Sequence, residues 1–140
     1  MFSVPVREVM SREPLLLATP HSTVSEAARR MADGKASAIV VIDHSAVVGI
    51  FTGRDAVTRV LAAGSDPQTT CLAAVMTAAP LTTAPDSSFG HALNVMQTHG
   101  IRHLPVLENG IAVGMVSSRN ALDPELEEFV SETHRREGFR

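Results

Sequence analysis

The chain repeats itself, and this internal repeat restricts its possible folds more than any other feature. A shift of 65 residues aligns residues 49–55 with residues 114–120, and it pairs Pro20 with Pro85 and Met31 with Met96 in the same order. Ordered self-similarity of this kind indicates duplicated structural units that pack against each other. The 140 residues are therefore predicted to form two units of about 60 residues that share a core, since one such unit alone is only marginally stable.

After the shared proline, each copy is predicted to continue with a helix. Apolar side chains recur there at the i, i+3, i+4, i+7 spacing of a buried stripe. The stripe consists of Val24, Ala27, Ala28 and Met31 in the first copy and of Phe89, Ala92, Leu93 and Met96 in the second. Thr23 and Glu26 predict a capping box at the start of the first helix. Gly34 and Gly100 predict left-handed caps where the two helices end.

An apolar hairpin is predicted next in each copy. The expected strands are residues 38–42 and 46–51 in the first copy and residues 103–107 and 111–116 in the second. A short strand before each helix, at residues 15–18 and 81–83, completes a three-stranded sheet. A second helix is predicted after each hairpin, and in the first copy Val57, Val60 and Leu61 form its buried face. The sequence therefore predicts an α+β fold made of two β-α-β-β-α units.

Polar residues 64–70 separate the copies and are predicted to be a linker. We therefore divide the chain into a first repeat at residues 1–63, a second repeat at residues 71–123 and a C-terminal helix or tail at residues 124–140. The tail begins with Pro124 and runs from acidic to basic residues, an order that suits the helix dipole. We expect it either to pack on its own module or to contribute to a dimer interface.

Composition argues against several classes of protein. The net charge of −3 and the absence of Trp and Tyr disfavour a nucleic-acid partner. Cys71 is the only cysteine, which excludes an intrachain disulfide framework, and we expect no metal site. The start does not resemble a signal peptide and there is no long apolar run, so a cytoplasmic protein without a membrane partner is predicted. No catalytic motif is visible, and we expect no enzyme.

The duplicated motifs resemble those of the CBS domain family. Val-Met near the start of each copy, a proline before the helix, a buried hairpin and the run Gly-hydrophobic-x-Thr/Ser-x-x-Asp are similar to a CBS domain. Two such copies resemble the CBS pair, or Bateman module, here without an attached catalytic domain. The resemblance covers residues 6–122 and implies units packed with pseudo-two-fold symmetry. It also implies a homodimeric sensor that binds AMP, ADP, ATP or S-adenosylmethionine between the copies and regulates an unknown protein partner.

Thr52 and Asp55 lie where a strand is predicted to end and a helix to begin. Free N–H groups and the positive end of the helix dipole make such a place a natural anion site. The hydroxyl can donate to a phosphate, the carboxylate can accept from a ribose, and Arg54 can supply positive charge. The same Thr-x-x-Asp spacing equally matches a capping box that needs no ligand.

The resemblance implies two composite clefts. The first would combine Thr52 and Asp55 with Ile101, Arg102 and His103. The second would combine Ser117 and Asn120 with Ala36 and Ser37, and Arg102 would reach its phosphate. Arg119 is also expected to bind the ligand. Thr82 matches a threonine that is frequent in the family.

One departure from the family pattern affects the second cleft, and strand geometry affects the first. Asn120 stands where the first copy has a carboxylate, so we expect weaker or different binding in the second cleft. Strand alternation also predicts that Arg102 and His103 do not line the same wall. The alternative function is a ligand-free module for dimerisation or protein interaction, with vestigial clefts.

Overall fold

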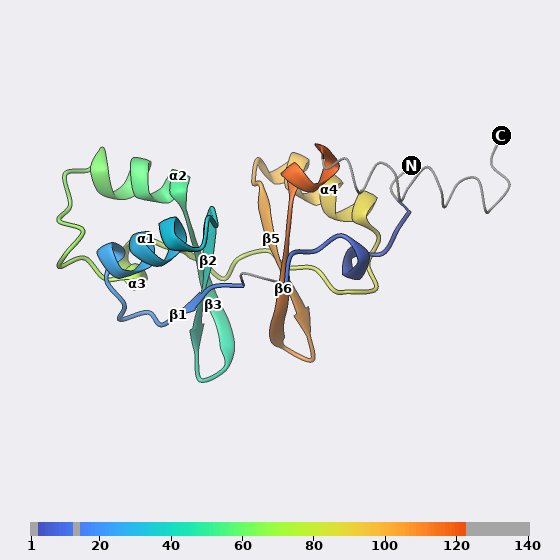
Figure 1. Ribbon diagram of the computed structural model, residues 1–140, viewed down its shortest axis with the longest axis horizontal. Helices are drawn as coiled ribbons and strands as arrows, with labels where there is room; N and C mark the ends of the chain where they lie inside the picture. The colour runs from blue at the N-terminus through green and yellow to red at the C-terminus, as the bar shows by residue number, and fades with distance from the viewer. Residues whose placement is uncertain (1–2, 13–14, 123–140) are drawn as a thin grey trace, which may run out of the picture.

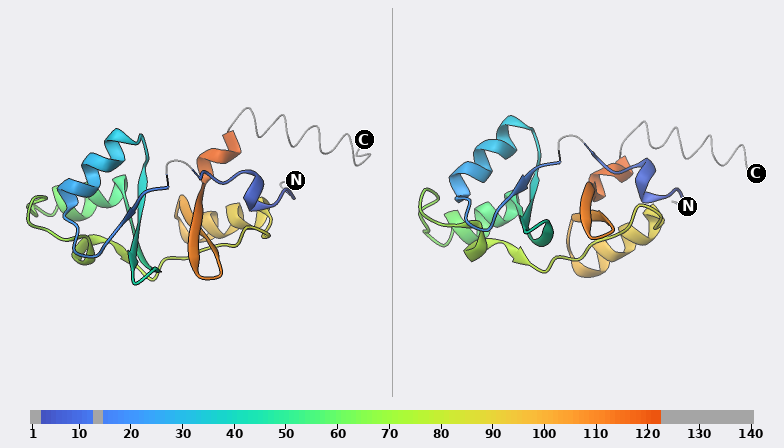
Figure 2. Two further views of the ribbon diagram at one scale, coloured as in Figure 1. Left: turned by 60° about the horizontal axis from the view of Figure 1, so that its bottom comes forward. Right: turned by 90° about the horizontal axis from the view of Figure 1, so that it is seen from below.

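The computed structural model describes residues 3–12 and 15–122, so the predicted C-terminal helix or tail lies outside the described residues. The elements, in chain order, are η1 (Val6–Glu8), β1 (Leu17–Ala18), α1 (Val24–Asp33), β2 (Ala38–Asp43), β3 (Ala46–Thr52), α2 (Gly53–Asp55), η2 (Ala56–Leu61), α3 (Leu72–Val75), β4 (Thr77–Ala78), α4 (Phe89–His99), β5 (His103–Glu108), β6 (Ile111–Ser117) and η3 (Ser118–Leu122). They form two lobes with their sheets at the centre of the molecule and α1, α3 and α4 further out (Figure 1, Figure 2). The predicted α+β tandem fold is confirmed.

The two sheets differ, although the copies that form them are similar in sequence. The first sheet has the order β1-β2-β3-β4, with β1 parallel to β2 and the other neighbours antiparallel. In the second lobe β5 and β6 form an antiparallel pair, and Thr83 makes only an isolated parallel bridge to Val106. The predicted three strands are present in the first copy as β1, β2 and β3, whereas the prediction of a third strand in the second copy is wrong. Leu81 and Thr82 are exposed, so strand formation there would gain little apolar burial.

Most buried apolar side chains of the described residues form two clusters, not the single shared core that was predicted; Ala38, Val40 and Ile50 are buried outside both. The first cluster lies between α1 and the four-stranded sheet and includes Ile39 and Phe51. The second lies around α4, β5 and β6 and includes Phe89 and Leu104. Each lobe therefore buries its own apolar face.

Each core also takes a segment from the start of the other copy. Leu72 and Val75, at the start of the second copy, belong to the first core. Val4 and Val6, at the start of the chain, belong to the second core, and the Val6 N–H donates to the carbonyl of Ser87 (2.7 Å). This exchange ties the lobes together, because neither core is complete without the other copy's first segment.

The two long helices bury their predicted stripes except at Ala28, which is exposed, and at Leu93, which is half-buried. Thr23 caps α1 by accepting a hydrogen bond from the backbone three residues later (3.2 Å), and Gly100 ends α4 with a φ of +64°. Both caps were predicted. The left-handed cap predicted at Gly34 is wrong, because helical hydrogen bonding extends through this residue (φ −86°). The chain reverses one residue later, at Lys35 (φ +53°).

The helix after the first hairpin has a wider turn than predicted. Its first part, α2, is α-helical, but η2 is a π-helix, with a bond from the Ala62 N–H to the Val57 carbonyl (2.8 Å). Val60 is buried as predicted, whereas Val57 and Leu61 are 56% and 68% exposed. The predicted stripe is wrong at these two positions because a π-helix does not keep the 3.6-residue period. Val57 and Leu61 instead form an exposed apolar patch.

Candidate ligand site between the two repeats

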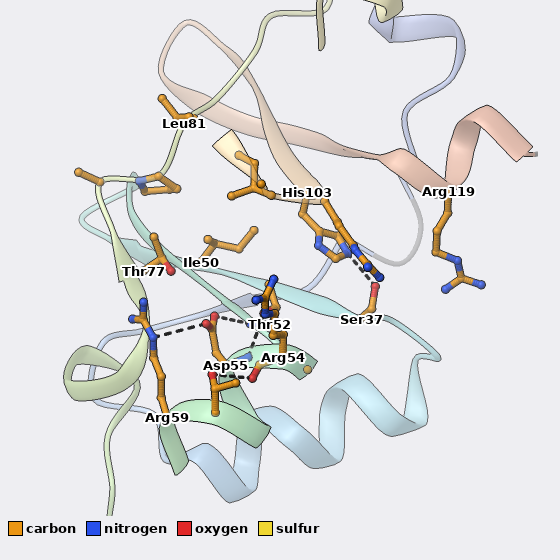
Figure 3. A pocket seen from close by; sticks show the side chains of 17 residues that line it. Ser37, Ile50, Thr52, Arg54, Asp55, Arg59, Thr77, Leu81, His103 and Arg119 are labelled. Atoms are coloured by element: carbon orange, nitrogen blue, oxygen red, sulfur yellow. Dashed lines mark hydrogen bonds and ion pairs between the residues drawn. The ribbon is translucent and has the colours of Figure 1, made fainter. Parts of the chain in front are cut away.

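A cavity of about 1090 Å³ lies between the two lobes. The residues that line it are Ser37, Ile50, Thr52, Gly53, Arg54, Asp55, Thr58, Arg59, Thr77, Ala79, Pro80, Leu81, Gly100, Ile101, Arg102, His103 and Arg119. Residues of both copies line this cavity (Figure 3). The volume is at the upper end of the range for small-molecule sites, so a nucleotide-sized ligand fits. All the residues predicted for the first cleft come together here.

Thr52 and Asp55 form a reciprocal capping box on the first-lobe wall. The Thr52 N–H donates to Oδ2 of Asp55 (3.0 Å), and the Asp55 N–H donates to Oγ1 of Thr52 (3.2 Å). Asp55 is only 9% exposed and is the one buried charged residue in the described part of the chain. An ionised carboxylate offers about four acceptor positions, so the cap leaves Asp55 free to accept further bonds. Capping and ligand contact are therefore compatible.

Positive charge predominates in the cavity. Arg54, Arg59, Arg102 and Arg119 line it, whereas Asp55 is its single acidic residue. Nε of Arg59 lies 3.6 Å from Oδ1 of Asp55. The sequence analysis missed Arg59, although the i, i+4 spacing from Asp55 on a predicted helix was an available signal. The excess of guanidinium groups favours an anionic ligand.

His103 joins the two lobes across the cavity, because its Nε2 lies 2.8 Å from Oγ of Ser37. Burial lowers the pKa of His103, the positive charges of Arg102 and Arg119 lower this pKa further, and Asp55 opposes them. His103 is therefore neutral near pH 7. The prediction that Arg102 and His103 line different walls is wrong: both line the cavity, because β5 begins at His103 and Arg102 precedes the strand.

Apolar side chains gather at one end of the cavity. Figure 3 shows Ile50, Thr77 and Leu81 at this end, away from Arg119. Thr77 is opposite Ile50 in the pairing of β4 with β3. These three residues were not predicted as site residues, because Thr77 reaches Ile50 only through the pairing of β4 with β3.

The cavity includes only some of the other residues predicted to bind the ligand. Ser37 and Arg119 line the cavity already described, whereas Ala36, Thr82, Ser117 and Asn120 do not. The Ser117 N–H donates to Oδ1 of Asn120 (2.8 Å). This motif thus repeats one half of the capping box of the first copy, with a neutral amide in place of the carboxylate.

The described ranges, 3–12 and 15–122, show neither a membrane-spanning helix nor a metal centre. No helix there combines the length and the apolar character that crossing a bilayer requires. Nor do three or more His, Cys, Asp or Glu side chains from these ranges gather where they would hold a metal ion.

Comparison with known proteins assigns the chain to a family. The model of the CBS domain matches residues 6–62 and again residues 72–124. The chain therefore belongs to the CBS domain family and holds two CBS domains in tandem. CBS domain pairs are in general regulatory modules.

The relatives include proteins of very different length. The chain is 31% identical over 112 residues to the CBS domain-containing protein YhcV of Bacillus subtilis, a match that covers 80% of this chain and 79% of YhcV. It is 39% identical over 102 residues to the CBS domain-containing protein CBSCBSPB2 of Arabidopsis thaliana, covering 72% of this chain but only 19% of that relative. The chain thus spans about a fifth of this plant relative.

Solved structures show the same fold. An uncharacterised conserved protein from Pyrococcus horikoshii is 30% identical, with a TM-score of 0.80 over 87% of this chain and 92% of its own. A protein from Burkholderia ambifaria, described as a putative signal-transduction protein with CBS domains, is 25% identical, with a TM-score of 0.81 over 89% of this chain and 96% of its own.

Proposed function

We propose that this chain is a non-catalytic sensor module that binds an adenine nucleotide in the cavity between its two lobes. The observation that carries the proposal is the combination, in one cavity, of a buried carboxylate, four arginines and an apolar end. An adenine nucleotide has matching parts: a flat base, a ribose diol and a phosphate. AMP, ADP and ATP are the preferred candidates, because the arginines disfavour the positively charged sulfonium of S-adenosylmethionine.

The cavity suggests one orientation for the nucleotide. The base would lie at the apolar end beside Ile50 and Leu81, and the ribose hydroxyls would donate to Asp55 in charge-assisted hydrogen bonds. The phosphate would lie towards Arg102 and Arg119, since guanidinium groups bind phosphate oxygens in pairs. This placement uses groups from both lobes.

Because the ligand would touch both lobes, it would stabilise one arrangement of the lobes over others. A protein partner, not yet identified, would read that arrangement. The strength of such a signal is limited by the difference in ligand affinity between the two arrangements. The Ser37–His103 hydrogen bond joins the two lobes at the wall of this cavity.

An adenosine ligand on this fold has a precedent. The CBS domain pair of protein MJ0100, which is 23% identical to this chain with a TM-score of 0.76, is described in complex with 5′-methylthioadenosine and S-adenosylmethionine. Homodimerisation is also part of the proposal, with the exposed apolar patch of Val57 and Leu61 as a contact. A cytoplasmic location and the absence of nucleic-acid and membrane partners stay predictions.

The second candidate function is a ligand-free interaction module. It is favoured by Asn120, which removes the carboxylate from the second copy, and by the exposed patch of Val57 and Leu61. In that case the arginines of the cavity would contact an acidic partner protein and not a nucleotide.

Calorimetry and thermal unfolding with AMP, ADP, ATP and S-adenosylmethionine test the proposal. A ligand at 100 times its Kd should add about 2.7 kcal/mol to the free energy of unfolding. Asp55→Ala should abolish this gain. The matched control is Asn120→Ala, which removes the corresponding cap of the second copy outside this cavity and should leave binding intact. A folded wild-type protein that binds none of the four ligands would instead support the interaction module.

A further inference from the structure

We propose that Arg59 is a positioning residue that orients the carboxylate of Asp55 and thereby makes the site select ribonucleotides over deoxyribonucleotides. This inference rests on the proposed nucleotide site and assigns a role to a residue outside the Thr-x-x-Asp motif. Arg59 lies on η2, four positions after Asp55, and lines the same cavity. In Figure 3 its guanidinium lies between Thr77 and Asp55.

The Asp55 carboxylate is held at both oxygens. Oδ2 accepts a hydrogen bond from the Thr52 N–H (3.0 Å), and Oδ1 faces Nε of Arg59 in an ion pair of 3.6 Å. The last torsion of an aspartate side chain has only a broad preference, so outside groups must set the plane of the carboxylate. A ribose diol requires that plane to be set, because its two neighbouring hydroxyls donate to oxygens in one defined orientation.

Arg59 is itself fixed at the far end of its guanidinium. Nη1 donates to the carbonyl of Met76 (2.9 Å) and lies 3.4 Å from the carbonyl of Val75. These carbonyls are at the end of α3, where backbone acceptors lack helical partners. Because the guanidinium is planar and rigid, anchoring Nη1 limits where Nε can lie. A chain of contacts therefore runs from the end of α3 through Arg59 to Asp55.

The second copy supports the reading of Asp55 and Arg59 as a pair. The shift of 65 residues places Asn120 at the position of Asp55 and Pro124 at the position of Arg59. The carboxylate and its cation are thus present together in one copy and absent together in the other. A neutral amide has no negative charge for a guanidinium to orient, so this joint loss is expected if the arginine serves the carboxylate.

The test measures the Kd of AMP and ATP, each against its 2′-deoxy form, by calorimetry on the full chain. Wild type should prefer the ribonucleotide about tenfold or more, the value of one hydrogen bond to a charged group. Arg59→Gln should reduce this preference at least about threefold, because it should raise the Kd of the ribonucleotide more than the Kd of the deoxy form. Arg59→Lys keeps the charge but lacks the planar fork, and it should also lose preference; it serves as the second variant if Arg59→Gln does not fold.

The matched control is Arg54→Gln, which removes the same charge from the same cavity, since no ion pair joins Arg54 to Asp55 in the described residues. It should raise the Kd of the ribonucleotide and of the deoxy form by the same factor, so the ratio of the two Kd values should not change. In an Asp55→Asn background, adding Arg59→Gln should not change the ratio further. Equal weakening of both forms by Arg59→Gln would overturn the positioning role while leaving the nucleotide site in place. Failure of folded wild type to bind AMP or ATP would overturn the proposed function and this inference together.

Discussion

Replacing Gly49 or Gly114 by alanine tests whether the exchanged segments hold the two lobes together. Each glycine lies in the second strand of its hairpin, directly under a methionine from the start of the other copy. Met76 lies over Gly49, and Met10 lies over Gly114. A methyl group added at either position would therefore clash with the exchanged segment. The loss in free energy of unfolding then measures how tightly that segment is packed.

The structure sets different costs for the two positions. A Cβ at residue 49 would lie 2.3 Å from Sδ and 2.9 Å from Cγ of Met76, so the methionine must swing away and lose packing. A Cβ at residue 114 would lie 2.7 Å from Sδ of Met10 and 3.1 Å from the backbone oxygen of Ser11. That oxygen accepts a hydrogen bond from the Met115 N–H (2.9 Å) and cannot rotate aside. Overpacking costs about 1–3 kcal/mol; we expect the lower half of this range for Gly49→Ala and the upper half for Gly114→Ala.

Urea and thermal unfolding measure these costs, and Gly53→Ala is the control. Nothing lies within 4 Å of a Cβ built on Gly53, so its free energy of unfolding should stay within about 0.5 kcal/mol of wild type. One kcal/mol corresponds to a change of several degrees in Tm for a domain of this size. If Gly49→Ala and Gly114→Ala are as stable as Gly53→Ala, the methionines do not pack on these glycines and the exchange described above is refuted.

Two further predictions concern His103 and the exposed apolar patch. The pKa of His103 is lowered from 6.5 in the folded state. Below pH 6.5 the unfolded chain therefore binds more protons than the folded chain. The stability that neutral His103 contributes is lost as the pH falls through the lowered pKa. The difference in unfolding free energy between wild type and His103→Gln should therefore be constant above about pH 6.5 and should change below it; a difference independent of pH would contradict this. If Val57 and Leu61 form a dimer contact, replacing both by serine should shift the mass measured by light scattering from dimer to monomer, whereas the exposed Ile111 (56%) replaced by serine should not.

Local sequence patterns predicted most of the secondary structure because they depend on neighbouring residues only. The stripe of α1, its cap at Thr23 and the left-handed residue Gly100 follow from helical spacing and backbone sterics. The hairpin turn at Asn109 and Gly110, both with positive φ, follows from the same kind of rule. The capping box of Thr52 and Asp55 was likewise predicted as one of two compatible interpretations.

Local patterns failed where the result depends on the path of the backbone or on a distant segment. The exposure of Val57 and Leu61 depends on the π-helical turn, which the apolar spacing does not encode. The placement of Arg102 on the same wall as His103 depends on the residue at which β5 begins. The alternation of side chains holds only within a strand, and tertiary pairing sets where the strand begins. The rule was therefore applied to Arg102, which lies one residue before β5.

By itself the sequence determined that the chain is a tandem pair, because duplicated motifs survive as a pattern of residue types along the chain. It also identified Asp55, Arg54, Arg102 and Arg119 as candidate charged residues of the site. Only the tertiary structure decided that the first segment of each copy completes the core of the other. That exchange pairs Thr77 with Ile50 and places the Met76 carbonyl 2.9 Å from Nη1 of Arg59. These contacts join residues through packing and strand pairing between separate segments, and spacing along the chain carries no record of such contacts.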